Sequence, residues 1–297
     1  MDSMIEHRFV EANGIRFHVA LAGHGPLVLL LHGFPECWYS WRLLLPVLAE
    51  AGYRAAAPDL RGYNLTDKPQ GGYDIETLVE DVVSLARQLG DGRPVHVVGH
   101  DWGGIIAWQA AWRHPEALRS LTVMNAPHPT AFARYVRRRP RQLLKSSYML
   151  LFQAPGIPEW LLARARAQAV ASAFRRSAHR HDVFSDADLE VYREAALRPG
   201  AATAALNYYR QAIRQGSRAL PTTRIRVPTL LLWGMDDPVL EWGSNADLGA
   251  WVENLRVRQI RDCGHWTQQE RPDVVHSEVL GWFAEVDRPL GTAAANL

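Results

Sequence analysis

The sequence predicts an α/β fold, in which a mostly parallel central sheet is flanked by helices and interrupted by a helical insert. In 1–129 and 219–297, short apolar segments alternate with segments of helical periodicity, an order typical of parallel sheets. Several apolar segments are continuous, as in strands that are buried on both faces. From 130 to 218 the chain is helical in character, rich in Arg and Ala, and contains no convincing buried strand. We therefore expect one core built from two sequence pieces, with a cap domain at 130–218.

A hairpin opens the first core piece. Asn13-Gly14 is a strong signal for a two-residue turn, so strands are expected at 7–11 and 15–20. The apolar run 26–31 predicts a strand buried in the middle of the sheet. The same periodicities place the other elements of this piece in the following order: a helix at 38–48, a weaker strand at 53–58, a helix at 75–89, a strand at 94–98, a helix at 103–113 and a strand at 118–124.

The second core piece supplies the end of the sheet. Strand character returns at 229–233 and again at 256–260. A last helix is expected at 272–284, and the chain from Asp287 to Leu297 has the composition of a frayed tail.

Composition excludes several classes of function. The 297 residues, 47% hydrophobic and 22% charged, are typical of a soluble globular protein, and a net charge of +2 gives no reason to expect a nucleic acid or membrane partner. The basic run Arg134–Arg141 is expected to be a solvated surface. No apolar run reaches the roughly 18 residues of a membrane span, and Met1–His7 lacks the pattern of a secretory signal. Cys37 and Cys263 form neither a disulfide framework nor a metal cluster, so we expect a cytoplasmic protein without metal.

The segment Val95–Ala107 (VHVVGHDWGGIIA) has the form of a nucleophile elbow, a sharp turn between a strand and a helix that presents one reactive side chain. Gly99, Gly103 and Gly104 would relieve the crowding that such a turn creates. The usual elbow presents Ser or Cys. Here the presented residue is Asp101, so we expect a carboxylate nucleophile.

The nucleophile needs a base and a group that orients the base. His265 follows the strand expected at 256–260, and an acidic pair, Asp236 and Asp237, follows the strand before it. Both groups therefore leave carboxyl ends of strands and can converge on the nucleophile, in the chain order nucleophile, acid, histidine. We expect His265 to be the base and a carboxylate to hold its tautomer. Spacing alone favours Asp237 but leaves Asp236 open.

A carboxylate nucleophile selects a class of reaction. Attack by Asp101 on saturated carbon gives an alkyl ester, whose carbonyl group water can hydrolyse. Serine would give an ether, which has no such group. The expected substrates are therefore epoxides or alkyl halides. Hydrolysis of the ester requires an oxyanion hole, for which the backbone N–H groups of Phe34 and Trp102 are suitably placed in the sequence. An epoxide oxygen leaves as a basic alkoxide and needs a proton donor such as tyrosine from the cap.

Over roughly 7–284 the chain resembles the α/β-hydrolase-fold epoxide hydrolases. Four motifs carry the resemblance: His32-Gly33-Phe34-Pro35-Glu36, Trp38-Tyr39-Ser40-Trp41-Arg42, Gly99–Gly104 and Asp262-Cys263-Gly264-His265-Trp266-Thr267-Gln268. The loop with Asn64-Leu65 departs from the family, whose members commonly have Gly-x-Ser there, which puts only the conformation of that loop in doubt.

The resemblance implies further site residues. Two cap tyrosines bind and protonate the epoxide oxygen in the family, and the matching residues are Tyr148 and Tyr209, with Tyr208 as a packing neighbour. The resemblance also implies Asp237 as the acid and a cis peptide bond before Pro35. Residues expected to shape the elbow and the pocket are His32, Gly33, Pro35, His100 and Trp266.

The resemblance thus implies an epoxide hydrolase that needs no cofactor and converts a small-molecule epoxide and water into a vicinal diol. A haloalkane dehalogenase and a non-catalytic ligand receptor on the same fold are the alternatives. Fluoroacetate dehalogenases are also similar, but they carry Arg where this chain has Trp102. The sequence leaves open which epoxide is the natural substrate and whether two copies associate as a homodimer.

Overall fold

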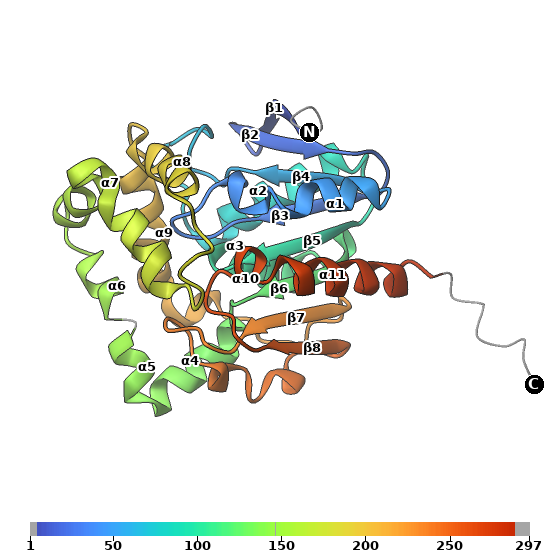
Figure 1. The fold of residues 1–297 in the computed structure, drawn as a ribbon. Coiled ribbons are helices and arrows are strands. Elements are labelled where there is room, and N and C mark those ends of the chain that lie inside the picture. The colour runs from blue at the N-terminus through green and yellow to red at the C-terminus, as the bar shows by residue number, and fades with distance from the viewer. Residues whose placement is uncertain (1–4, 146, 289–297) are drawn as a thin grey trace, which may run out of the picture.

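The computed structural model describes residues 5–145 and 147–288 of the chain. Eight strands form one sheet in the order β1-β2-β4-β3-β5-β6-β7-β8 (Figure 1). Only the β1–β2 and β2–β4 pairs are antiparallel. The sheet confirms the predicted fold class. The strands are β1 Glu6–Ala12, β2 Ile15–Ala22, β3 Leu27–Leu31, β4 Arg54–Pro58, β5 Val95–His100, β6 Leu118–Met124, β7 Thr229–Gly234 and β8 Leu255–Ile260.

Helices cover both faces of the sheet. Helices α1 (Leu44–Glu50) and α11 (Pro272–Val286) lie on one face, and α2 (Ile75–Leu89) and α3 (Trp102–Arg113) lie on the other (Figure 1). Neighbouring residues of one strand point to opposite faces of the sheet. Because helices cover both faces, the central strands are apolar throughout, and each strand contributes side chains to both apolar layers. This double burial fixes the central strands firmly beneath the site.

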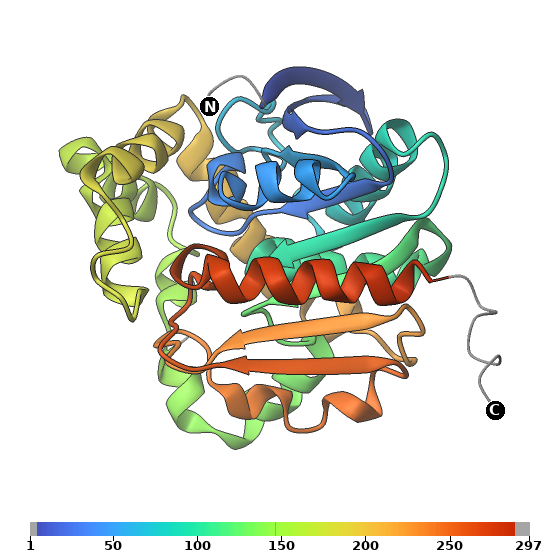
Figure 2. The ribbon, with the colours of Figure 1, turned by 45° about the vertical axis from the view of Figure 1, so that its right-hand side comes forward.

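In the part of the chain that the structure describes, six α-helices lie between β6 and β7, where the sequence predicts the cap. In Figure 2 the arrowheads of β7 and β8 point toward the side of the molecule on which these helices lie. They pack partly around a cluster of their own that includes Phe174 and Tyr192, into which the core residue Trp266 inserts. None of the helices in the described residues is both long and apolar enough to cross a bilayer. The six are α4 Pro129–Arg138, α5 Pro140–Lys145, α6 Tyr148–Leu151, α7 Ile157–Ser177, α8 Asp186–Leu197 and α9 Ala201–Gln215.

The structure corrects two details of the prediction. The single helix expected at 38–48 is a 3₁₀ turn, Trp38–Trp41, followed by α1. Pro46 has no N–H to bond the carbonyl of Arg42, so a continuous α-helical ladder cannot run through this segment. The frayed tail was also predicted to start too early in the sequence. Its first residue, Asp287, is held in place by its carboxylate, which accepts hydrogen bonds from Tyr53 and Arg119. The rest of that predicted tail, 289–297, lies outside the described residues.

Candidate active site

Asp101 occupies the turn between β5 and α3. Its backbone has φ 48° and ψ −119°, a strained conformation for a residue with a side chain. The turn is possible because the chain after it is small: a Cβ built on Gly103 would lie 2.1 Å from the Leu31 carbonyl oxygen. The strand–turn–helix geometry predicted for this segment is therefore confirmed, and it places the carboxylate at the carboxyl end of the sheet.

The Asp101 carboxylate faces two backbone N–H groups. The Phe34 N–H donates to Oδ1 over 2.8 Å, and a Cβ on Gly33 would lie 2.4 Å from the same oxygen, which explains the glycine. Burial raises the pKa of Asp101, while His265, His100 and the N–H groups of Phe34 and Trp102 partly offset this effect. The two N–H groups that the sequence suggests as oxyanion donors thus already point at the carboxyl group.

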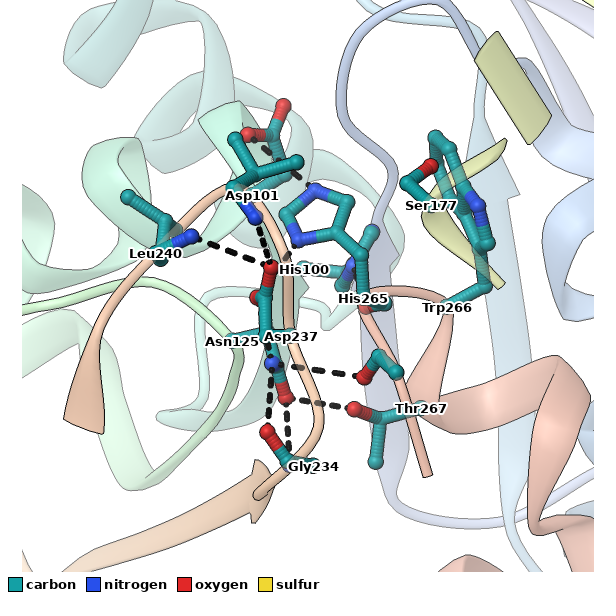
Figure 3. Close-up of polar contacts among 12 residues, drawn as sticks. His100, Asp101, Asn125, Ser177, Gly234, Asp237, Leu240, His265, Trp266 and Thr267 are labelled. Carbon is teal, nitrogen blue, oxygen red and sulfur yellow. Dashed lines mark hydrogen bonds and ion pairs between the residues drawn. The ribbon is translucent and has the colours of Figure 1, made fainter. Parts of the chain in front are cut away.

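His265 lies between the two carboxylates (Figure 3). Its Nδ1 donates to Asp237 Oδ2 over 2.8 Å, and its Nε2 lies 3.8 Å from Asp101 Oδ2. Burial opposes the charged form of His265, but the charge of Asp237, its hydrogen bond and the charge of Asp101 together raise the pKa of His265 to about 9. Asp236, the alternative acid, is exposed and makes no contact with the imidazole of His265 among the described contacts.

Asp237 is held by a residue that sequence analysis does not identify. Asn125, just after β6, donates from Nδ2 to Asp237 Oδ2 over 2.7 Å, while its Oδ1 accepts from Gly234 N and Thr267 Oγ1 (Figure 3). The backbone N–H of Leu240 also donates to the carboxylate. Burial would raise the pKa of Asp237, but His265 and these donors outweigh it and hold the pKa below its ordinary value. A polar residue at the carboxyl end of a buried strand was the signal available for Asn125.

His100 and Glu36 form a buried hydrogen-bonded pair next to Asp101. His100 Nδ1 lies 2.7 Å from Glu36 Oε2, and its Nε2 lies 2.8 Å from the backbone carbonyl oxygen of His265. Each ring nitrogen of His100 therefore lies within hydrogen-bond distance of an oxygen atom. Burial opposes ionisation of Glu36, but His100 overcomes it and lowers the pKa of Glu36 to about 2. Glu36 belongs to a motif quoted above, yet nothing in its spacing indicates this contact.

The other predicted structural residues lie around this centre. His32 accepts from Leu60 N through Nε2 and donates from Nδ1 to Gly33 O, so it links two loops, as expected. The peptide bond between Phe34 and Pro35 is cis, as expected. Trp266 does not line the cavity at Asp101 but packs against the cap helices, with its indole N–H donating to the Phe174 carbonyl.

Both predicted tyrosines line the cavity in front of Asp101. This cavity has a volume of about 270 Å³ and is lined by Asp101, Trp102, Tyr148, Tyr209 and mainly apolar side chains, among them Ile105, Phe132, Met149, Ile213 and Leu240. The rings of Tyr148 and Tyr209 lie 6.0 Å apart. Desolvation first, and then the neighbouring negative charge of Asp101, raise the pKa of Tyr148; burial, Tyr148 and Asp101 raise the pKa of Tyr209. Both phenols therefore keep their protons at neutral pH.

Tyr208, the expected packing neighbour, points away from the cavity. It is fully buried, and its hydroxyl donates to the Arg61 carbonyl over 2.8 Å. The departing loop residue Asn64 has a positive φ of 39° and donates to the Asp59 carboxylate, so it supports its own loop away from Asp101.

Within the described residues, one group of side chains could share a metal ion: His179, Asp236 and Asp262, whose ligand atoms lie within 4.8 Å of one another. All three are exposed, and none lines the cavity at Asp101. Cys37 and Cys263 are buried free thiols.

Several known proteins are similar to this chain. A family model described as the alpha/beta hydrolase fold matches residues 26–272. The AB hydrolase superfamily protein YfhM of Bacillus subtilis (strain 168) is 41% identical, over 94% of this chain and 98% of its own length. Epoxide hydrolase 3 of Xenopus tropicalis is 40% identical, over 92% of this chain and 76% of its own. A crystal structure of a mutant epoxide hydrolase from Bacillus megaterium superposes with a TM-score of 0.85 at 27% identity, covering 93% of this chain and all of that one.

The chain therefore belongs to the α/β-hydrolase family. Within that family it belongs to the group that contains the epoxide hydrolases.

Proposed function

We propose that this protein is an epoxide hydrolase that opens an uncharged, mainly apolar epoxide to a vicinal diol through an ester on Asp101. The observation that carries the proposal is the cavity itself, in which a carboxylate faces two phenols across a mainly apolar space. The similarity to epoxide hydrolases supports the same reaction.

In the first step the Asp101 carboxylate attacks a ring carbon, and the bond between that carbon and the epoxide oxygen breaks. Oδ1 is occupied by the Phe34 N–H, so Oδ2 is the oxygen available to attack. The departing oxygen takes a proton from Tyr148 or Tyr209, which leaves a tyrosinate and a hydroxyalkyl ester. A protonated phenol can make this transfer because its pKa lies below that of the alkoxide.

Ester formation removes the negative charge of Asp101, which is one of the causes that raise the pKa of His265, so the imidazole loses its proton more readily. In the second step the neutral His265 removes a proton from water, and the hydroxide attacks the ester carbonyl carbon of Asp101. The carbonyl oxygen is Oδ1, so the N–H groups of Phe34 and Trp102 stabilise the oxyanion that forms. The bond between that carbon and Oδ2 then breaks, and the diol, which now carries Oδ2 as a hydroxyl oxygen, leaves with the proton from His265. The remaining proton of water returns to the tyrosinate, so the enzyme is regenerated.

The test is a His265→Gln variant mixed with styrene oxide. We expect the ester to form and remain, because no base activates water. Mass spectrometry of the intact protein should therefore show an adduct of one substrate mass, and digestion should locate this adduct on the peptide containing Asp101. Asp101→Asn, as the matched control, should show none. Absence of an adduct from His265→Gln, together with absence of diol from the wild-type protein, would reject the proposal.

The alternatives give different results in the same assay. A haloalkane dehalogenase would release halide from bromoalkanes and form no diol from styrene oxide. A non-catalytic receptor would bind epoxides in the cavity and turn over neither substrate.

A further inference from the structure

Glu270 is a buried carboxylate that the proposed mechanism does not use. It is 1% exposed, at the end of the short helix α10 (Thr267–Glu270), five residues after His265. Among the described residues no Lys, Arg or His side chain forms an ion pair with it. Four backbone N–H groups bind it instead, which satisfies a charge that would otherwise be costly to bury.

The four donors come from two separate parts of the chain. Oε2 accepts from the N–H groups of His179 (2.8 Å) and Arg180 (3.2 Å), which belong to the cap loop after α7. It also accepts from Gly264 N over 3.0 Å, and Oε1 accepts from Trp266 N over 3.1 Å. These last two residues flank His265 on either side, so a single carboxylate joins the cap to the loop that carries the base.

The backbones of the two segments are in direct contact at this junction. The His265 N–H donates to the carbonyl of Ser177, the last residue of α7, over 3.1 Å. A Cβ built on Gly264 would lie 2.6 Å from His179 N, 2.7 Å from Ser177 O and 2.9 Å from Glu270 Oε1. Residue 264 therefore has to be glycine for the cap loop to reach the histidine loop.

From this geometry we infer that Glu270 is a positioning residue, which holds the His265 loop in register against the cap and thereby keeps the imidazole placed for hydrolysis of the ester. The carboxylate binds the main chain on both sides of the base, and the cap supplies the other half of its donors. The inference rests on the proposed function, because it concerns the second of the two steps.

Glu270→Gln tests the inference. The variant keeps the size of the side chain but replaces one carboxylate oxygen by an NH₂ group. This group cannot accept hydrogen bonds from the backbone N–H groups, so part of the contact between Glu270 and the two segments is lost. Attack by Asp101 does not use His265, so ester formation, followed by quenched-flow mass spectrometry with styrene oxide, should stay within about threefold of wild type. Ester hydrolysis should slow by about tenfold or more, because a base misplaced by about 1 Å loses most of its effect. The ester should accumulate, and the pH midpoint of its hydrolysis should fall as His265 shifts away from Asp237.

A second variant acts on the junction from the other side. Gly264→Ala leaves Glu270 intact, but its methyl group would displace the cap loop from the loop that carries His265. This variant should show the same selective loss of ester hydrolysis. If Glu270→Gln does not fold, Gly264→Ala still tests the inference. Glu278→Gln is the matched control, since this carboxylate on α11 pairs with the exposed Arg258 over 3.1 Å and should leave both rates and the pH midpoint unchanged.

Equal slowing of both steps with an unchanged pH midpoint would show that Glu270 only maintains the fold, and wild-type hydrolysis in both junction variants would show that it has no role in the reaction. Either result overturns the inference. If His265→Gln forms no ester and the wild-type protein forms no diol, the proposed function fails. If the ester forms and the junction variants behave as wild type, only the inference about Glu270 fails.

Discussion

A partly exposed carboxylate, Asp101, and a buried one, Asp237, flank the imidazole of His265, and the different surroundings of the two acids give them different pKa values. Asp237 accepts hydrogen bonds from His265, Asn125 and the backbone, so its pKa stays low and it remains ionised. Asp101 has fewer donors and faces an apolar cavity, so burial dominates and its pKa rises. A more basic carboxylate is a better nucleophile, while the ionised partner stabilises the imidazolium. The roles proposed for the two acids follow from this difference.

The two phenols should share the work of protonating the epoxide oxygen. Tyr148→Phe or Tyr209→Phe alone should slow ester formation about tenfold, because the other hydroxyl still faces the cavity, and the double variant should slow it by a factor nearer to 10³. Stopped-flow measurement of ester formation checks this. Tyr208→Phe, whose hydroxyl binds the Arg61 carbonyl outside the cavity, is the control and should leave ester formation close to wild type. A double variant as fast as wild type would remove the phenols from the mechanism.

The His265–Asp237 pair should make stability depend on pH. The pKa of His265 is about 9 in the folded protein, above the unfolded value of 6.5. The folded state therefore binds the proton more tightly, so the stabilisation is complete below pH 6.5 and is lost as the pH rises through about 9. The difference in unfolding free energy between wild type and His265→Gln, measured by denaturant titration, should shrink over this interval. A difference that is constant with pH would contradict the assignment of a raised pKa.

At the scale of elements, the parallel sheet brings the reactive groups together. Asp101 follows β5, Asp237 follows β7 and His265 follows β8, so three segments far apart in sequence end at one edge. Larger side chains are not tolerated where α3 begins, because Gly103 of this helix lies directly against the backbone of Leu31 in β3.

Gly103→Ala should therefore be severely destabilising. Its Cβ would meet the backbone oxygen of Leu31 at 2.1 Å, and neither atom belongs to a flexible side chain. We expect a loss of about 3 kcal/mol or more in unfolding free energy, or no soluble protein. Gly281→Ala in α11 is the matched control: nothing lies within 4 Å of the new methyl group, and alanine should stabilise that helix by about 0.5–1 kcal/mol. Thermal or denaturant unfolding of both variants checks the pair, and similar stabilities would contradict the packing described at the elbow.

What the sequence predicts well is what its periodicity encodes. Continuous apolar runs locate the central strands, and Asp101 is found because it directly follows such a run. His265 is found because it lies next to a glycine shortly after the last predicted strand. The cap tyrosines came only from the family resemblance, since a tyrosine on a helix has no distinctive spacing. Glu36 and Asn125 were missed because each acts through hydrogen bonds to residues distant in sequence. Such hydrogen bonds depend on how distant segments pack in the folded protein, and a local sequence pattern does not predict them.

At the scale of the whole molecule, the cap completes a site that the sheet begins. In the proposed mechanism the sheet side supplies the nucleophile, base, acid and oxyanion donors, while α6 and α9 supply the two tyrosines. A mainly apolar cavity of about 270 Å³ separates the two groups. The Glu270 junction lies behind the base and fastens the same cap to the same loop. Chemistry at Asp101 therefore depends on both parts of the chain.

The most direct test of the central claim follows the oxygen atom that water contributes. In a single turnover in H₂¹⁸O with enzyme in excess over epoxide, water attacks the Asp101 carbonyl, so the account predicts ¹⁸O in the peptide containing Asp101 and a diol that carries only oxygen from the enzyme and the substrate. Mass spectrometry of both products reads the label. A diol labelled in that first turnover, with an unlabelled Asp101 peptide, would mean that water attacks the epoxide itself and would contradict the covalent mechanism.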